Sequence, residues 1–272
     1  MKPSLFYSHV LSAADQQGMD VDRMLDATRP LGYCGVDLSS EQLLKASKEV
    51  PRRLKRADME IASVYKFCKF NESFDQEDMK HFLDSVAESG CGRVMIIPGF
   101  FREDHHRKSE LSSMTEALGK TCELAQSFGI SVTLEDYDDP LSPCSHLSDL
   151  QSFFRAVPQL RFTLDTGNFL FESADLLSEI YPTLRDRIVH VHLKDRVKAP
   201  LTVGDVCFFE GSREAVYSAP VGAGYLPIRE CLSCLHANGY NGFLTVEHFG
   251  AADHYDYIKR SAEWLKKTLS VL

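Results

Sequence analysis

The sequence predicts a single (β/α)8 TIM barrel that spans residues 1–272 as one domain. Two observations lead to this fold class. Eight short runs rich in β-branched and aromatic residues follow one another, and a segment with helical periodicity comes after each run. Alternating strands and helices form parallel βαβ units, and eight such units close into a barrel. Closed α/β barrels commonly use about 250 residues, so one domain accounts for the chain.

The predicted strands and helices alternate without a linker or a low-complexity segment between them. Several helices stop just before a glycine, as at Gly32, Gly90 and Gly129, because glycine is favoured at helix C-termini. We expect strands at residues 4–10, 35–40, 60–67, 91–99, 130–137, 160–168, 188–195 and 242–249. We expect helices at about residues 20–31, 41–57, 76–88, 109–128, 146–156, 174–185, 227–237 and 253–269.

An open doubly wound sheet is the alternative for the same alternation. Such sheets usually carry a glycine-rich phosphate loop after the first strand, but SHVLSAADQQG contains no G-x-G. The longest irregular segment, 196–226, follows the seventh predicted strand. Loops of this length in compact domains are usually functional, so we expect this one over the C-terminal face of the barrel.

Composition limits the partners. The formal net charge is −9, which disfavours binding to nucleic acid or to an anionic membrane surface. No apolar run approaches the roughly 18 residues that a membrane helix needs. The N-terminal apolar run contains Ser8 and His9 and lacks a convincing cleavage site, so it does not resemble a signal peptide. We therefore expect a cytoplasmic protein that binds neither nucleic acid nor membranes.

Candidate functional residues lie at the ends of the last four predicted strands. In a barrel the active site forms at the C-terminal strand ends, and alternate residues face the lumen. This pattern brings together one inward-facing residue from each strand: Glu135, Asp165, His192 and Glu247. A single acid at a strand end is often only the N-cap of the next helix. Three clustered carboxylates, however, repel one another unless a cation neutralises them. The set predicts one divalent metal ion, Mn²⁺ or Mg²⁺ first, with Co²⁺ or Zn²⁺ as alternatives.

The segments LEDYD, LDTGN, HVHLKD and TVEHF, in this order, resemble the xylose-isomerase-like barrels. This superfamily includes sugar epimerases, hydroxypyruvate isomerase, inosose dehydratase and family 2 AP endonucleases, and the resemblance covers essentially the whole chain. Glu135, Asp165, His192 and Glu247 match the single-metal ligand set of the ketose epimerases. In those enzymes the two glutamates also move the substrate proton, which implies catalytic roles for Glu135 and Glu247. The resemblance further implies a homo-oligomer.

Two lumen-facing residues of the seventh predicted strand are candidates for substrate binding. His190 neighbours the predicted ligand His192. Lys194 lies two residues beyond that ligand, where it would hold an oxyanion or a phosphate of the substrate. The alternative for Lys194 is a structural ion pair with Asp165 or Asp195.

Three further candidates for substrate binding lie elsewhere. Asn168 stands where the epimerases carry a histidine that touches the substrate. Lys198 stands where they carry an arginine, with Arg196 nearby. Lys66, at the end of the third predicted strand, is a candidate on its position alone.

The function that these residues predict is a divalent-metal-dependent isomerase or epimerase. It would act on a small keto-sugar or polyol by proton transfer through a metal-stabilised enediolate. A dehydratase of the inosose or dehydroshikimate type is the first alternative, because it begins with the same proton removal. An AP endonuclease fits less well, since the fourth strand ends in IIPGFF without a histidine and the chain is acidic. A sugar-binding barrel without catalysis is the remaining alternative.

Overall fold

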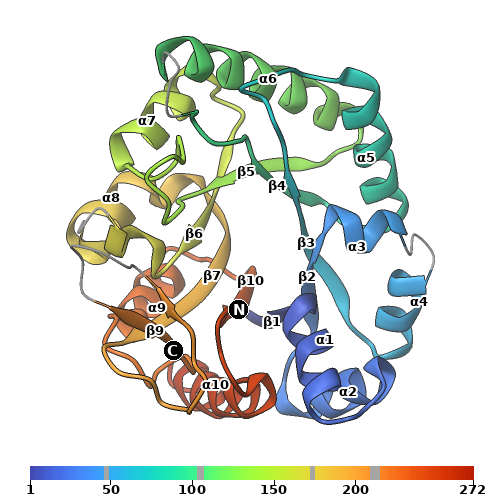
Figure 1. The fold of residues 1–272 in the computed structure, drawn as a ribbon, viewed down its shortest axis with the longest axis vertical. Helices are drawn as coiled ribbons and strands as arrows, with labels where there is room; N and C mark the ends of the chain where they lie inside the picture. Colours follow the sequence, from blue (N-terminus) through green and yellow to red (C-terminus); the bar gives the residue numbers. More distant parts are fainter. Residues whose placement is uncertain (46–48, 103–106, 172–174, 209–214) are drawn as a thin grey trace.

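The computed structural model describes residues 1–45, 49–102, 107–171, 175–208 and 215–272. Eight parallel strands form a closed barrel surrounded by helices (Figure 1), which confirms the predicted fold class. The last barrel strand pairs with the first, Lys2 opposite Phe243, and also with the seventh, which closes the ring. The barrel strands are β1 (Lys2–Phe6), β2 (Gly35–Ser39), β3 (Glu60–Phe67), β4 (Arg93–Ile97), β5 (Ser131–Glu135), β6 (Arg161–Asp165), β7 (Ile188–Val197) and β10 (Phe243–Glu247).

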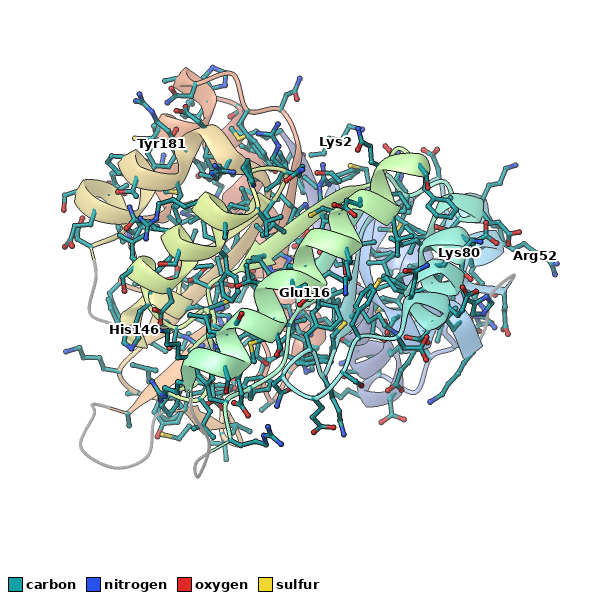
Figure 2. The ribbon with its side chains drawn as sticks, turned by 90° about the horizontal axis from the view of Figure 1, so that it is seen from above. Lys2, Arg52, Lys80, Glu116, His146 and Tyr181 are labelled. Atoms are coloured by element: carbon teal, nitrogen blue, oxygen red, sulfur yellow. The ribbon has the colours of Figure 1, made fainter. Side chains whose placement is uncertain are left out.

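The helices lie outside the barrel, and exposed charged side chains such as Lys80 and Glu116 lie on their outer faces (Figure 2). The α-helices are α1 (Tyr7–Gln16), α2 (Val21–Thr28), α3 (Ser40–Lys45), α4 (Glu49–Arg56), α5 (Gln76–Glu88), α6 (Arg107–Ser127), α7 (Leu147–Ala156), α8 (Tyr181–Leu184), α9 (Ile228–Ala237) and α10 (His254–Leu269). Shorter helical turns are η1 (Arg29–Leu31), η2 (Asn168–Phe171), η4 (Arg185–Arg187) and the π-helix η3 (Leu176–Ile180). Within the described parts of the chain, no helix is both long and apolar enough to cross a membrane.

The first strand was predicted too far along the chain. β1 ends at Phe6, and the next residues begin α1, a helix that the sequence analysis did not predict. Tyr7, Val10 and Ala14 are buried in that helix at spacings of three and four residues. This helical spacing overrides the strand propensity of the tyrosine and valine.

Two other predicted segments have more internal structure than expected. The predicted helix 41–57 consists of α3 and α4, with 46–48 outside the described residues. The predicted helix 174–185 consists of η3, α8 and the first residue of η4, and residue 174 lies outside the described part.

The predicted loop 196–226 contains two short strands, β8 (Cys207–Phe208) and β9 (Val216–Ala219). β9 pairs antiparallel with the end of β7, which runs on to Val197, and β8 pairs with β9. Residues 209–214 of this segment are not described.

Several polar side chains in the barrel lumen form hydrogen bonds with one another. Ser4 and Thr245 lie 2.7 Å apart through their hydroxyl oxygens, and Thr133 and Thr163 lie 2.8 Å apart in the same way. The hydroxyl of Thr245 also donates to Asp37 at 2.9 Å. Because buried polar groups are stable only when they are hydrogen-bonded, this layer is a fixed support for the strand ends above it.

Candidate active site

The four predicted metal ligands come together at the C-terminal ends of their strands. Glu135 ends β5, Asp165 ends β6, His192 lies in β7 and Glu247 ends β10. One ligand atom from each residue lies within 4.8 Å of the others, and all four residues are buried. Strand alternation places them in the lumen, whereas neighbours such as Leu134 and Val246 face the helices.

His192 is held between carboxylates at both ring nitrogens. Its Nε2 lies 3.0 Å from Oδ2 of Asp37, and its Nδ1 makes a short hydrogen bond with Glu135. Glu247 Oε2 lies 3.6 Å from the same Nδ1. Burial alone would lower the pKa of His192, but Glu135 and Asp37 outweigh burial and raise this pKa well above its usual value. Nδ1 therefore faces the carboxylate cluster, while Nε2 is anchored below it.

Asp165 has one oxygen satisfied and one without a hydrogen bond. Its Oδ1 accepts the backbone N–H groups of Gly167 at 2.7 Å and Asn168 at 2.8 Å. Among the described residues no hydrogen bond reaches the buried Oδ2, and its nearest cation is Lys194 Nζ at 3.5 Å. Burial raises the pKa of Asp165 to about 6. An orphaned carboxylate oxygen beside two glutamates and an imidazole is a donor set that fits a divalent cation.

Lys194 lies inside this cluster and also faces the cavity. Its Nζ lies 2.6 Å from Glu247 Oε1 and 2.5 Å from Oδ1 of Asn168. Burial acts to lower the pKa of Lys194, but Asp165 and Glu247 outweigh burial and raise it. The ion pair with Asp165 agrees with the structural alternative for Lys194, and the carboxylate of Glu247 is a second partner.

A cavity of about 390 Å³ opens onto the cluster, a volume within the roughly 300–1,000 Å³ range of small-molecule sites. Glu135, Glu247, Lys194 and Asn168 are the polar lining residues next to the carboxylate cluster. The other lining residues are mostly aromatic or apolar: Phe6, Tyr65, Phe67, Met95, Ile97, Tyr137, Asp138, Arg196, Phe208 and Phe249.

Three of the predicted substrate contacts do not line this cavity in the described structure. Lys66 faces the helices, where its Nζ pairs with Asp78 at 3.1 Å, because Tyr65 and Phe67 take the cavity-facing positions of β3. Lys198 lies exposed beyond the end of β7. His190 lies deeper in the lumen, fully buried, with its Nε2 2.7 Å from Asp37.

The structure adds two residues to the site that the sequence analysis did not include. Asp37, from β2, contacts Nε2 of both His190 and His192 through one oxygen, Oδ2. Arg196, only 2% exposed, lies in the cavity wall with its guanidinium over the ring of Phe208. His190, His192 and Lys194 alternate along β7, and Arg196 is the next residue in this alternation because β7 continues to Val197. This alternation is the signal that could have identified Arg196.

Comparisons with known proteins agree with this fold. The model of the xylose isomerase-like TIM barrel family matches residues 25–268. No curated protein matches the sequence significantly.

Solved structures resemble the whole chain at low sequence identity. The probable 3-DHS dehydratase AsbF of Bacillus anthracis has a TM-score of 0.76 at 19% identity, covering 98% of this chain and 99% of that one. The D-psicose 3-epimerase of Clostridium cellulolyticum H10 has a TM-score of 0.74 at 15% identity, covering 100% and 99%. A xylose isomerase-like protein of Mycobacterium smegmatis in complex with magnesium has a TM-score of 0.68 at 17% identity, covering 92% and 88%. With the family model matching most of its length, the chain belongs to the xylose isomerase-like TIM barrel family.

Proposed function

We propose that the protein is a divalent-metal-dependent isomerase or epimerase that moves a proton on a small keto-sugar or polyol. The observation that carries this proposal is the pair of glutamates that line one cavity, Glu135 from β5 and Glu247 from β10. Two carboxylates on one cavity can take a proton from a carbon atom and return it at another position or on another face. The D-psicose 3-epimerase among the similar structures supports this class of reaction.

Each glutamate has its own proton partner. Glu135 contacts Nδ1 of His192, and Glu247 contacts Nζ of Lys194. Burial raises the pKa of Glu135, which makes its carboxylate a stronger base than an exposed glutamate. In the proposed cycle one glutamate accepts the substrate proton at a carboxylate oxygen, and the other donates a proton back. The roles exchange when the reaction runs in reverse.

Four side chains would hold the metal ion: Glu135, Asp165, Glu247 and His192 through Nδ1. When bound, a divalent cation polarises the substrate carbonyl and stabilises the negative charge that develops on oxygen as the proton leaves. Three carboxylates with one imidazole favour Mn²⁺ or Mg²⁺, and Co²⁺ or Zn²⁺ also suit the set. The magnesium complex among the similar structures supports this assignment.

The remaining lining residues would orient the substrate. Lys194 and Asn168 present an ammonium and an amide beside Glu247. The aromatic walls, with Tyr65 and Phe249 among them, would exclude water from the reacting atoms. The polar groups lie at the carboxylate end of the cavity, and the aromatic rings form its walls. This arrangement suits a small polyol whose hydroxyls contact the polar groups and whose carbon skeleton packs against the rings.

Arg196 favours a second candidate, a dehydratase acting on a cyclic keto-polyol that carries a carboxylate. Its contacts to Asp138 and Ser218 are long, 3.3 and 3.4 Å, and its buried Nε has no hydrogen-bond partner among the described residues. A guanidinium with free donors binds carboxylates in a bidentate manner. The dehydratase among the similar structures supports this alternative.

Deuterium exchange tests both candidates. The metal-loaded protein is incubated in D₂O with a panel of ketoses and cyclic keto-polyol acids, and deuterium at the carbon next to the ketone is measured by NMR. Glu135→Gln and Glu247→Gln should lower the exchange rate about 10²–10⁴-fold, because the amide cannot act as a base. Glu116→Gln, on the exposed face of α6, is the matched control.

The products and the metal content decide the outcome. Exchange without loss of water indicates an isomerase or epimerase, and loss of water indicates the dehydratase. Wild-type exchange in both glutamine variants with the metal still bound would disprove the proton-transfer roles. No turnover of any substrate would leave a sugar-binding barrel as the better account.

A further inference from the structure

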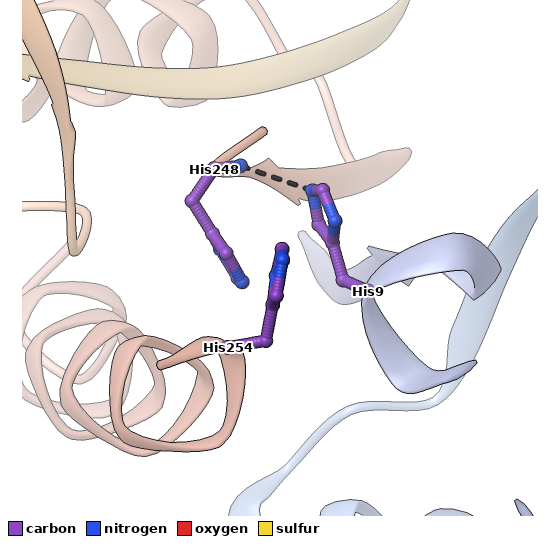
Figure 3. A group of neighbouring side chains, drawn as sticks. All are labelled: His9, His248 and His254. Atoms are coloured by element: carbon purple, nitrogen blue, oxygen red, sulfur yellow. Dashed lines mark hydrogen bonds between the residues drawn. The ribbon is translucent and has the colours of Figure 1, made fainter. Parts of the chain in front are cut away.

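Three histidines gather outside the lumen, beside the point where the barrel closes. His9 lies on α1, His248 directly follows β10, and His254 is the first residue of α10 (Figure 3). The ring centroids of His9 and His248 are 4.2 Å apart, and the ring of His254 lies 5.0 and 5.1 Å from them. All three side chains are buried, and none of them lines the described cavity. The proposed function does not use them.

The ring nitrogens of this histidine triad (His9, His248 and His254) are poorly satisfied. Neither nitrogen of His248 nor Nδ1 of His254 has a hydrogen-bond partner among the described residues. His9 Nε2 accepts the backbone N–H of His248 at 3.0 Å, the dashed line in Figure 3. Buried polar atoms without hydrogen-bond partners cost free energy of folding. Three such nitrogens in one cluster therefore indicate that a ligand would stabilise the cluster.

The imidazoles of the triad are in the form that binds metals. Burial lowers the pKa of His9 well below the usual value, and burial also lowers the pKa of His254. Neutral rings keep a lone pair on one nitrogen, which is the form that coordinates a metal ion.

We propose that His9, His248 and His254 form a second metal site that takes a transition-metal ion, with Zn²⁺ as the best fit. One ring nitrogen from each residue lies within 4.8 Å of the others. Nitrogen ligands of tetrahedral zinc lie about 3.4 Å apart. The ring of His9 stacks on those of His248 and His254, at interplanar angles of 20° and 29°, so the rings would turn out of this stack to direct their lone pairs at one ion. Binding exchanges the hydrogen bond at His9 Nε2 for a bond to the ion. Three imidazoles without a carboxylate suit Zn²⁺, Co²⁺, Ni²⁺ or Cu²⁺ rather than Mg²⁺ or Mn²⁺.

The position of the triad indicates a structural role. An ion there joins the segments after β1 and β10, the two strands whose pairing closes the barrel. His9 also packs against Phe6 and Phe249, at centroid distances of 5.5 and 4.5 Å, and both rings line the active-site cavity. The ion would therefore stabilise the junction of β1 and β10 and one wall of the cavity.

Metal counting separates this site from the carboxylate cluster. Metal-free protein is dialysed against Zn²⁺ or Mn²⁺, and bound ions per chain are measured by elemental analysis. We expect more Zn²⁺ than Mn²⁺ per wild-type chain. Asp165→Asn should keep the zinc of the triad, and the Asp165→Asn/His254→Asn double variant should lose it. His81→Ala, an exposed histidine of α5, is the control. The free cysteines are present in every variant, so they cancel in these differences.

Two results would overturn the proposal. The first is equal zinc content and an equal zinc-induced rise in Tm in the Asp165→Asn protein and the double variant. The second needs no change in the triad, and so holds even if the double variant fails to fold. A zinc X-ray absorption spectrum of Asp165→Asn should show more than one imidazole nitrogen per zinc, and a spectrum with at most one, which His192 alone would supply, would contradict the site. Loss of Mn²⁺ binding alone would affect only the proposed function.

Discussion

Oδ2 of Asp37 lies 3.0 Å from Nε2 of His192, so a carboxylate fixes the imidazole on the side away from Glu135. A carboxylate in this position sets the tautomer of a metal-binding histidine and raises its basicity. The same oxygen of Asp37 lies 2.7 Å from His190 Nε2, which ties it to the polar lumen. Asp37 is therefore a positioning residue for the predicted metal site.

Asp37→Asn should weaken Mn²⁺ binding about 10–100-fold, because His192 loses the charge that orients it. Binding is measured by titration calorimetry on metal-free protein. Asp58→Asn, on the surface, is the control. Unchanged Mn²⁺ affinity in Asp37→Asn would show that the aspartate supports only the lumen.

Lys194→Met should make the protein more dependent on metal for its stability. The substitution removes an ammonium 2.6 Å from Glu247 and 3.5 Å from Asp165, both buried. Uncompensated buried charges typically cost about 3–5 kcal/mol, and a divalent ion would replace the missing positive charge. Calorimetry should show a larger Mn²⁺-induced rise in Tm than in wild type or in Lys120→Met, whose ion pair is exposed. Equal rises in all three would refute the compensation.

Arg196→Lys should discriminate between charged and neutral ligands. If the dehydratase candidate is correct, lysine loses the bidentate contact and weakens binding of a cyclic polyol acid about 10-fold or more. Binding of the matching neutral polyol should not change. Both affinities are measured by calorimetry on the metal-loaded protein. A parallel loss for both ligands would mean that Arg196 only supports the wall of the cavity.

The histidine triad should make stability fall as the pH falls, in metal-free protein. Because the pKa of His9 is lowered in the fold, the unfolded chain binds a proton near pH 6.5 that the folded chain does not. The stability that neutral His9 contributes is complete above pH 6.5 and is lost below it, at about 1.4 kcal/mol per pH unit. Urea unfolding with EDTA at pH 7.5 and 5.5 should show a smaller loss in His9→Gln, and an identical loss would contradict a buried neutral ring.

Much of the barrel could be predicted because its signals are local. Strict alternation in HVHLKD separates lumen from helix-facing residues, and it placed His192 and Lys194 correctly. Alternation also accounts for Lys66, which was chosen for its position at the strand end. Its Nζ pairs with Asp78, whereas its strand neighbours Tyr65 and Phe67 line the cavity.

Other features depend on contacts that no local pattern reveals. The pairing of β7 with β9 carries the strand past Asp195, so Arg196 rather than Lys198 reaches the cavity. Asp37 belongs to the site only because β2 and β7 face each other across the lumen. The histidine triad collects residues from both ends of the chain, a proximity that exists only once β1 and β10 have paired.

In the proposed function, the pairing of β9 with Asp195–Val197 would separate the residues that carry the chemistry from those that shape the upper wall of the cavity. The four predicted ligands belong to the barrel strands, whereas Phe208 and the strand β9 that pairs beside Arg196 belong to a segment inserted between β7 and β10. Changes in that segment can reshape the upper wall without touching the carboxylates below. Barrel closure does not require this segment, because the ring closes through the pairing of β10 with β1 and β7.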